Sequence, residues 1–530
     1  MWSRPSIALV SSLLPVAFAV DTIVDLGYQS YEGVSEDTGI SSWLGMRYAS
    51  PPLGDLRFAA PMDPEESDGE VAPADARGPV CMATDADPSD TMSEDCLFVN
   101  VWAPSDANST SNLPVYFFIQ GGGFNSNSNP DLDGTGLIQA ADMGIVVVTL
   151  NYRVGLYGFL AGAEIESTNN GLKDQIKALE WVQNYISEFG GNPDHVTIGG
   201  ASAGGASVTL LLTAYGGRDD GLFHAAAAES QSFPSMYTVE ESQYQTDTLV
   251  ERTECGSSDP AEILSCLRSL DVETLQEHGS ASPLPGAENP PLFMYGPTID
   301  DDIVQDITLR LFEDGKFIQV PTIHGSVANE GTVFAPKDAE TLEDTDTFLH
   351  DHWPQLTTEQ LDTIHPMYSD NETFPDSGAL WRYTSDIYGD IRYACPGTYI
   401  SSIYSAQNPS ETWNYRYAVE DPTDMESGLG VPHVVEIHSI WGPDYSGGGA
   451  PASYTEENAA IIPIMQAYWT SFIRTYNPNT YRDPDSIEWG LWGEEGRIYI
   501  KTDDLRMEQL DDAQAEKCDY LGSIQFDLAQ

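Results

Sequence analysis

The chain has 530 residues, of which 41% are hydrophobic, and its 22 Lys and Arg against 83 Asp and Glu give a formal net charge of −61 at pH 7. This composition supports a large buried core and argues against a disordered chain. The negative field repels nucleic-acid phosphates and anionic membranes, so it excludes nucleic-acid partners and disfavours anionic substrates. We interpret the acidity itself as a solubility feature rather than as part of a functional site.

Residues 1–19 carry the pattern of a secretory signal peptide. Arg4 precedes an apolar run that ends in the sequence AFA, the small-residue motif of a cleavage site. No other apolar stretch approaches the about 20 residues that span a bilayer, so we expect a secreted, extracellular mature chain with no transmembrane segment. Because no repeat period, long linker or heptad pattern interrupts them, residues 20–530 are expected to form a single domain.

Strand-like and helix-like patterns alternate along the first half of the chain. VYFFIQ (115–120) and IVVVTLNYR (145–153) predict buried strands, DQIKALEWVQNYISEFG (174–190) predicts an amphipathic helix, and VTI (196–198) predicts the next strand. This alternation indicates an α/β protein with a mostly parallel central sheet that helices cover on both faces. Two later segments mix polar runs with short helical patterns and are expected to form an upper region over the sheet: residues 240–295 and 340–390.

VTIGGASAGGASV, residues 196–208, places one serine where the predicted strand meets an Ala/Gly-rich segment. Ser202 is the central residue of a GxSxG motif. In a nucleophile elbow the backbone turns so sharply that only small neighbours fit, and the turn exposes the serine hydroxyl at the top of the sheet. The motif and its context therefore predict Ser202 as a nucleophile.

A second small-residue cluster precedes the elbow, in FFIQGGGFNS. An apolar strand runs directly into Gly121, Gly122 and Gly123, where missing side chains let backbone N–H groups approach a developing negative charge. This loop is the predicted oxyanion hole.

A serine nucleophile also needs a base and an orienting acid, and in this architecture the chain order is serine, acid, histidine. Glu330 follows a predicted strand, and His433 and His438 lie in the later loop GVPHVVEIHSIWG. The residues alone rank these two histidines only weakly. His350 and His352 resemble a fragment of a metal site, but no further ligand has matching spacing, so no metal is predicted.

The chain has six cysteines, with no CxxC spacing: Cys81, Cys96, Cys255, Cys266, Cys395 and Cys518. An even number of cysteines in a secreted chain predicts disulfides. Closeness in sequence favours pairing the first with the second and the third with the fourth, and leaves the last two as a third pair or as two buried thiols. Asn108 and Asn371 begin glycosylation sequons, whereas Asn408 precedes a proline and does not.

From about residue 22 to 500 the chain resembles the type B carboxylesterase/lipase family, which includes fungal lipases and carboxylesterases, cholinesterases and the non-catalytic neuroligins. The motifs that carry the resemblance occur in one order: RYASPPLGDLRF, SEDCLFVNVW, QGGGF, VVVTLNYRVGLYGFL, GGASAGGASV, FHAAAAESQS, ANEGTVF, GVPHVVEIHSIWG and YWTSFIRTYNPN. The resemblance implies an α/β-hydrolase fold with helical insertions over the active site. It also implies a serine carboxylic ester hydrolase that cleaves small neutral esters through an acyl-enzyme and needs no cofactor.

Matched motif by motif, the resemblance implies Ser202 as nucleophile, Glu330 as acid and His433 as base. It also supports the disulfides Cys81–Cys96 and Cys255–Cys266.

The same matching implies that the backbone N–H groups of Gly122, Gly123 and Ala203 form the oxyanion hole. Ser230 is implied to be a polar residue near the acid. His438 falls where the family has no catalytic histidine, so we interpret it as structural.

Two positions depart from the family pattern. Gln120 and Ala201 replace the histidine of HGGGF and the glutamate of GESAGG. Neither position belongs to the triad, so we expect altered packing and polarity behind the site rather than loss of activity.

The sequence disfavours the alternatives to an esterase. A catalytically silent binding or adhesion protein on the same fold normally has a broken triad, whereas serine, acid and histidine are all present here. The resemblance to lipases implies an amphipathic flap within the first disulfide loop, but the segment between Cys81 and Cys96 is short and nearly all polar. The resemblance to cholinesterases implies a tryptophan in the same loop that holds the choline cation, and this segment has no aromatic residue.

Overall fold

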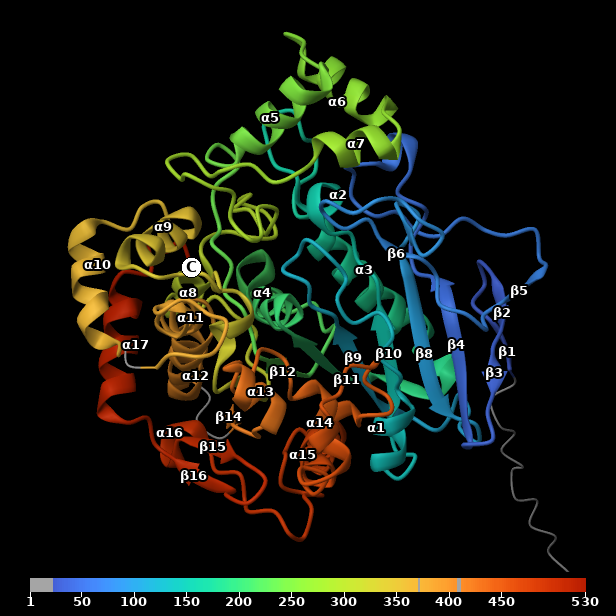
Figure 1. The fold of residues 1–530 in the computed structure, drawn as a ribbon. Helices are drawn as coiled ribbons and strands as arrows, with labels where there is room; N and C mark the ends of the chain where they lie inside the picture. Colours follow the sequence, from blue (N-terminus) through green and yellow to red (C-terminus); the bar gives the residue numbers. More distant parts are fainter. Residues whose placement is uncertain (1–21, 370–371, 408–410) are drawn as a thin grey trace, which may run out of the picture.

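The computed structural model describes residues 22–369, 372–407 and 411–530 (Figure 1). The predicted signal peptide, residues 1–19, and the sequon at Asn371 lie outside the described residues.

Within the described part of the chain an 11-stranded sheet runs through the centre of the molecule. In sheet order its strands are β16 (Arg506–Glu508), β15 (Arg497–Ile500), β14 (Thr412–Tyr417), β13 (Thr322–Val327), β12 (Ala225–Glu229), β11 (Gly191–Ala201), β9 (Leu113–Ile119), β10 (Val146–Leu150), β8 (Phe98–Pro104), β4 (Ile40–Arg47) and β3 (Val34–Ser35). Neighbouring strands from β10 to β15 pair in parallel, and antiparallel strands complete both edges. The predicted mostly parallel sheet is confirmed.

Helices pack on both faces of the sheet. Successive residues of a strand point to opposite faces, so each strand contributes side chains to two cores. In β9, Val115 and Phe117 belong to one core cluster, whereas Tyr116 and Phe118 belong to the other. The first cluster includes residues of α3 (Asn170–Tyr185), α4 (Ala203–Gly217), α8 (Thr308–Glu313) and α12 (Cys395–Gln407). The second includes residues of α1 (Thr135–Ala140), α14 (Ile437–Trp441) and α15 (Ile461–Thr475).

Shorter helices extend the molecule beyond these layers. At the top of Figure 1 lie α5 (Gln243–Thr253), α6 (Pro260–Ser269) and α7 (Val272–His278). A third core cluster joins residues of α9 (Leu342–His352), α10 (Thr358–Ile364), α11 (Trp381–Gly389) and α17 (Asp512–Ser523). The remaining α-helices of the described residues are α2 (Gly155–Phe159), α13 (Pro422–Ser427) and α16 (Trp492–Glu495). The segments 240–295 and 340–390 therefore contain the helical insertions that the sequence indicates.

The predicted elements are present, but they begin and end at other residues than expected. The helix expected at 174–190 begins at Asn170, after Asn169 with a φ of +54°, and its α-helical part ends at Tyr185. The strand expected at 196–198 extends over β11, because backbone pairing with β9 continues, across a register shift, through residues that are not apolar.

Three disulfides are formed in the structure. Both predicted pairs, Cys81–Cys96 and Cys255–Cys266, are present. The last two cysteines are also bonded to each other, which links the start of α12 to α17. Small sheets flank the main one, formed by β1 (Ile23–Asp25), β2 (Ser30–Glu32) and β5 (Val71–Pro73), and by β6 (Val80–Cys81) and β7 (Met92–Ser93). In the residues described, no helix has the length and apolarity needed to cross a membrane.

Candidate active site

The candidate nucleophile lies on a strained turn. Ser202 separates β11 from α4 with φ 58° and ψ −122°, a conformation that non-glycine residues rarely adopt. A Cβ at Gly200 would lie 2.5 Å from the backbone of Gly204, and one at Gly204 would lie 1.9 Å from the carbonyl oxygen of Ile119. The small residues of the motif are therefore required by close backbone contact, as the sequence predicts.

The segment after β12 is hydrogen-bonded to this elbow. The Ser202 N–H donates to the carbonyl oxygen of Glu229 at 3.0 Å, and the Ser232 N–H donates to the carbonyl oxygen of Ser202 at 3.2 Å. Between them, Ser230 Oγ accepts a 3.4 Å hydrogen bond from the N–H of Val434, the residue after the candidate base. These contacts bring the loop that carries His433 to the elbow.

The glycine loop lies against the serine. A Cβ at Gly121 would come within 2.8 Å of Ser202 Cβ, and a Cβ at Gly122 would come within 2.0 Å of the Ser126 carbonyl oxygen. Gly122 and Gly123 have φ of 115° and 62°, which favour glycine. Their N–H groups form no hydrogen bond within the described chain. The N–H of Ala203 belongs to the first turn of α4, where no intrahelical acceptor exists. All three N–H groups are thus available to an oxyanion.

The acid and base are brought together from two different loops. Glu330 begins a short 3₁₀ turn after β13 and is 3% exposed. Its Oε1 accepts a 2.8 Å hydrogen bond from the Val327 N–H, and its Oε2 accepts one from His433 Nδ1. Because Nδ1 donates to the carboxylate, Nε2 of the neutral imidazole is the proton acceptor. His433 Nε2 is buried and has no hydrogen-bond partner among the described residues.

Local packing fixes this pair. The Asn329 N–H donates to the Val431 carbonyl oxygen, and Asn329 Oδ1 accepts from the Val431 N–H, so the two loops are joined next to the pair. A Cβ at Gly331 would lie 1.8 Å from the Ser385 carbonyl oxygen, which explains the glycine after the acid. The rings of Phe334 and Tyr393 lie 5.0 and 4.6 Å from the His433 ring, centroid to centroid.

Two buried carboxyl groups lie near the site, those of Glu436 and Glu229, and neither was predicted from the sequence as a site residue. The Ser230 hydroxyl, which the resemblance implies to lie near the acid, donates to Glu436 Oε1 at 2.6 Å. Burial and the neighbouring Glu330 carboxylate raise the pKa of Glu436. The signal available in the sequence was the spacing of Glu436, three residues after His433 and therefore close to it.

A second buried carboxyl group lies at the end of β12. Glu229 Oε1 accepts hydrogen bonds from the Tyr116 hydroxyl at 3.1 Å and from Trp469 Nε1 at 2.8 Å. Burial raises the pKa of Glu229 to about 8. This side chain therefore holds a proton at neutral pH, directly before the segment that is clamped to the elbow.

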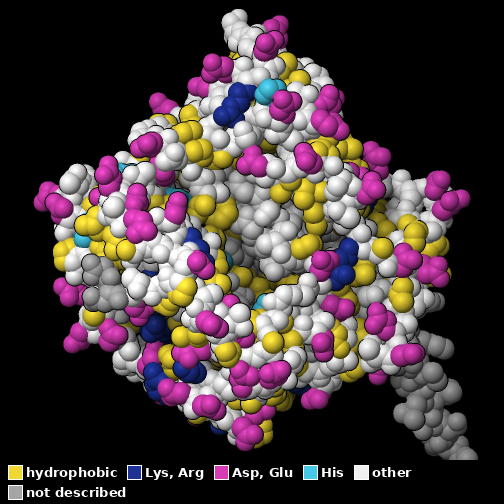
Figure 2. Space-filling view, viewed as in Figure 1, with side chains coloured by type: hydrophobic (Ala, Val, Ile, Leu, Met, Phe, Trp, Pro, Cys, Tyr) yellow, Lys and Arg dark blue, Asp and Glu magenta, His cyan; other side chains and the backbone are white. Residues whose placement is uncertain are grey.

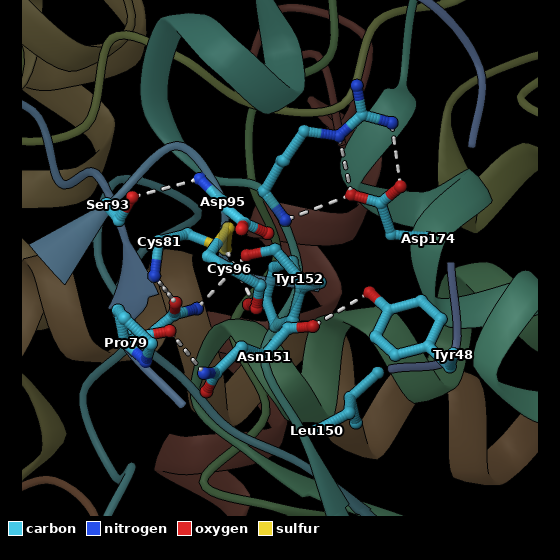
Figure 3. The surroundings of a disulfide bond; sticks show 12 residues. Tyr48, Pro79, Cys81, Ser93, Asp95, Cys96, Leu150, Asn151, Tyr152 and Asp174 are labelled. Carbon is cyan, nitrogen blue, oxygen red and sulfur yellow. Dashed lines mark hydrogen bonds and ion pairs between the residues drawn. A yellow bond between two sulfur atoms is a disulfide. The ribbon is translucent and has the colours of Figure 1, made fainter. Parts of the chain in front are cut away.

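Gln120, one of the two departures from the family pattern, supports the glycine loop. Its Nε2 donates to the Leu150 carbonyl oxygen at 2.9 Å and to Asn151 Oδ1 at 2.8 Å. Figure 3 shows Asn151 beside the Cys81–Cys96 disulfide, where its Nδ2 donates to the Pro79 carbonyl oxygen at 3.0 Å. The other departure, Ala201, is fully buried in the core. The glutamine thus ties the glycine loop to the end of β10 and, through Asn151, to the segment of the first disulfide.

The other candidate histidines have structural partners. His438 Nδ1 hydrogen-bonds to Ser446 Oγ, and burial lowers the pKa of His438 to about 4. His352 Nδ1 bonds to the Phe348 carbonyl oxygen, and its Nε2 accepts from the Leu292 N–H. No group of side chains suited to a metal ion occurs in the part of the chain that is described.

Comparisons with known proteins match this chain over most of its length. A family model described as "Carboxylesterase family" matches residues 26–521. Secreted lipase 4 of Gibberella zeae is 30% identical over 505 residues, covering 91% of this chain and 88% of that protein. The para-nitrobenzyl esterase of Bacillus subtilis is 30% identical over 500 residues, covering 91% and 94%. The crystal structure of Aspergillus niger EstA superposes with a TM-score of 0.94 and 41% identity, over 96% of this chain and 99% of that one.

Proposed function

Because the chain belongs to the carboxylesterase family and is a carboxylic ester hydrolase, we propose that it cleaves small esters through an acyl-enzyme formed on Ser202. The observation that carries this proposal is the Glu330–His433 pair, which leaves a buried, unpartnered Nε2 in a loop that is hydrogen-bonded to Ser230, in the segment that contacts the serine elbow. No hydrogen bond joins Ser202 Oγ to Nε2 in this structure. Such catalytic hydrogen bonds often tighten only when substrate binds.

In the proposed mechanism His433 Nε2 takes the proton of the Ser202 hydroxyl as the oxygen attacks the ester carbonyl carbon. Glu330 holds the imidazole by Nδ1 and stabilises its protonated form. The imidazolium then gives the proton to the leaving alcohol, and the acyl group remains on the serine. Water, deprotonated by the same Nε2, attacks the acyl-enzyme and releases the carboxylic acid.

The oxyanion of each tetrahedral intermediate is assigned to the N–H groups of Gly122, Gly123 and Ala203. These donors are fixed by the backbone before substrate arrives, so they need no reorganisation as charge develops. One such donor contributes on the order of 3 kcal/mol to transition-state stabilisation.

We further propose that the protein is secreted and that residues 20–530 form a single domain. The three disulfides and the relative named as a secreted lipase support secretion. Asn108 lies partly exposed in a loop, as a glycosylated asparagine must.

The test is hydrolysis of p-nitrophenyl acetate by the wild type, by Ser202→Ala and by a control, Ser269→Ala, which changes an exposed serine on α6. We expect Ser202→Ala to lose activity by roughly 10⁴-fold or more, and Ser269→Ala to match the wild type. A wild-type protein without activity would favour a binding protein on the same fold. Full activity in Ser202→Ala would place the nucleophile elsewhere.

A further inference from the structure

A cavity adjoins the candidate oxyanion loop, and its lining includes Gly123, Phe293, Tyr237, His352 and Arg392. A Cβ at Gly123 would lie 2.2 Å from the Phe293 ring, so this phenylalanine forms the wall next to the loop. Figure 2 shows a hollow near the centre of this face, with acidic side chains scattered over the surface around it.

Arg392 reaches this cavity from an irregular part of a helix. A π-helical turn, Asp390–Ala394, joins α11 to α12, and such turns occur frequently at functional sites. The next residue, Tyr393, packs against the His433 ring. On the other side, the Arg392 carbonyl oxygen accepts a 2.8 Å hydrogen bond from the N–H of Phe233, which directly follows the segment clamped to the elbow. Arg392 thus lies between the His433 ring and the segment that follows β12.

The guanidinium of Arg392 differs from every other buried arginine in the described chain. The others each pair with a carboxylate: Arg57 with Glu94, Arg153 with Asp174, Arg382 with Glu372 and Arg497 with Glu508. Arg392 is 7% exposed, makes no ion pair with a described carboxylate, and its buried Nε has no hydrogen-bond partner. Burial of an unpaired charge costs free energy. Since the chain has 83 acidic residues that could have paired with Arg392, its unpaired state indicates a function.

The groups near Arg392 do not neutralise it. Arg392 interacts electrostatically with the phenols of Tyr237, Tyr388 and Tyr393 and with the imidazole of His352, and its side chain hydrogen-bonds to Tyr393. Burial raises the pKa of Tyr237, so its hydroxyl keeps its proton. Burial lowers the pKa of His352 to about 4, so this imidazole is neutral. The cavity therefore offers one full positive charge and a phenolic O–H.

We propose that Arg392 binds an ionised carboxylate carried by the substrate, so that the enzyme favours esters that bear a second, free carboxyl group. A guanidinium presents two parallel N–H donors to a carboxylate, which makes this pairing strong and directional. The proposal rests on the hydrolysis proposed above: water still cleaves the acyl C–O bond, and the second carboxylate is unchanged by the reaction.

This substrate class departs from the expectation based on net charge, for a physical reason. The surface charges of the protein act on an anion through water and salt, which screen them beyond about 10 Å at 0.1 M ionic strength. A guanidinium in direct contact inside a cavity is screened much less. The field slows the approach of an anion, whereas Arg392 stabilises it once bound.

The test compares kcat/KM within two pairs of esters of matched shape. Monoethyl succinate carries its carboxylate on the acyl side and ethyl levulinate is its neutral counterpart. O-Acetylglycolate carries it on the alcohol side and acetoxyacetone is its counterpart. We expect the anionic ester to be favoured in at least one pair, which also assigns the cavity to the acyl or the alcohol group. Arg392→Gln should lower that anionic-to-neutral ratio by about 10- to 100-fold, and Arg392→Lys by less, because lysine keeps the charge without the two-pronged geometry.

Arg218→Gln is the matched control, because it removes the same charge from an exposed arginine at the opposite end of α4 from Ser202. Its ratio should equal that of the wild type. The proposal is overturned if Arg392→Gln leaves the ratio of both pairs unchanged. It is also overturned if the wild type prefers the neutral ester of both pairs at about 0.5 M NaCl, where the surface field is screened, a result that needs no variant to fold. In either case, Ser202-dependent hydrolysis of p-nitrophenyl acetate shows that only the substrate class has failed.

Discussion

Because the Glu229 carboxyl group is buried, we predict that the substitution Glu229→Gln removes part of the pH dependence of the free energy of unfolding. The pKa of Glu229 is raised by burial from 4.5 to about 8. Between these values the folded protein holds a proton that the unfolded chain has lost. Stability from this group is therefore greatest below pH 4.5 and decreases as the pH rises to about 8.

The size of this effect follows from the linkage relation. One pKa unit corresponds to about 1.4 kcal/mol, so Glu229 alone lowers the free energy of unfolding by about 1.5 kcal/mol between pH 6.5 and pH 8. Burial also lowers the pKa values of His324, His352 and His438 from 6.5 to about 4, and the effect of these histidines on stability has the opposite sign and is largest below pH 6.5. What remains of it above pH 6.5 is common to the wild type and Glu229→Gln and cancels when the two are compared. Glutamine resembles the protonated carboxyl group and retains an oxygen to accept the bonds from Tyr116 and Trp469.

The assay is urea unfolding at pH 6.5 and at pH 8, followed by tryptophan fluorescence, for the wild type, Glu229→Gln and the control Glu65→Gln, which changes an exposed glutamate. We expect the difference in unfolding free energy between the two pH values to be smaller by about 1.5 kcal/mol in Glu229→Gln, and unchanged in Glu65→Gln. An undiminished pH difference in Glu229→Gln would mean that Glu229 is ionised in the folded protein at pH 6.5, and the reasoning would be wrong.

Three further predictions concern the site and its supports. Glu330→Gln should reduce kcat by roughly 10³- to 10⁴-fold with the fold intact by circular dichroism, because the imidazole loses its orienting charge; a loss below about tenfold would remove Glu330 from the triad. The segment between Cys81 and Cys96 forms β7 and no helix, so tributyrin hydrolysis should show no steep increase in rate as the substrate passes its solubility limit; such an increase would indicate a lipase flap. The Cys395–Cys518 disulfide closes a loop of 123 residues, so replacing both cysteines by serine should lower the free energy of unfolding by about 3–5 kcal/mol in urea; an unchanged midpoint would mean that the bond constrains nothing.

Local patterns predicted the layers of the fold well. The apolar runs of β9 and β10 and the amphipathic stripe of α3 follow from side-chain periodicity, which burial on a covered parallel sheet enforces. The elbow was predictable for a similar reason, since close backbone contact at Gly200 and Gly204 excludes larger residues and leaves a visible motif.

Features that depend on distant contacts were not predictable from the residues alone. The pairing of Cys395 with Cys518 joins two helices that are far apart in the sequence, and no spacing indicates it. Glu229 and Arg392 are charged residues that in a sequence resemble surface positions. Their burial is set by helices and loops that pack over them only in the folded chain. Glu436, which accepts a hydrogen bond from the Ser230 hydroxyl, is likewise a charged residue whose burial arises only in the folded chain.

The central claim, that an acyl group is transferred to Ser202, is tested most directly by trapping the nucleophile. Diethyl p-nitrophenyl phosphate reacts with a serine that a neighbouring histidine activates, and the diethylphosphoryl group stays attached. We predict one adduct per chain by intact-mass measurement, located at Ser202 by peptide mass spectrometry, with activity lost in proportion to labelling and no adduct on Ser202→Ala. An adduct on another residue that abolishes activity, or full activity in protein labelled at Ser202, would contradict the account.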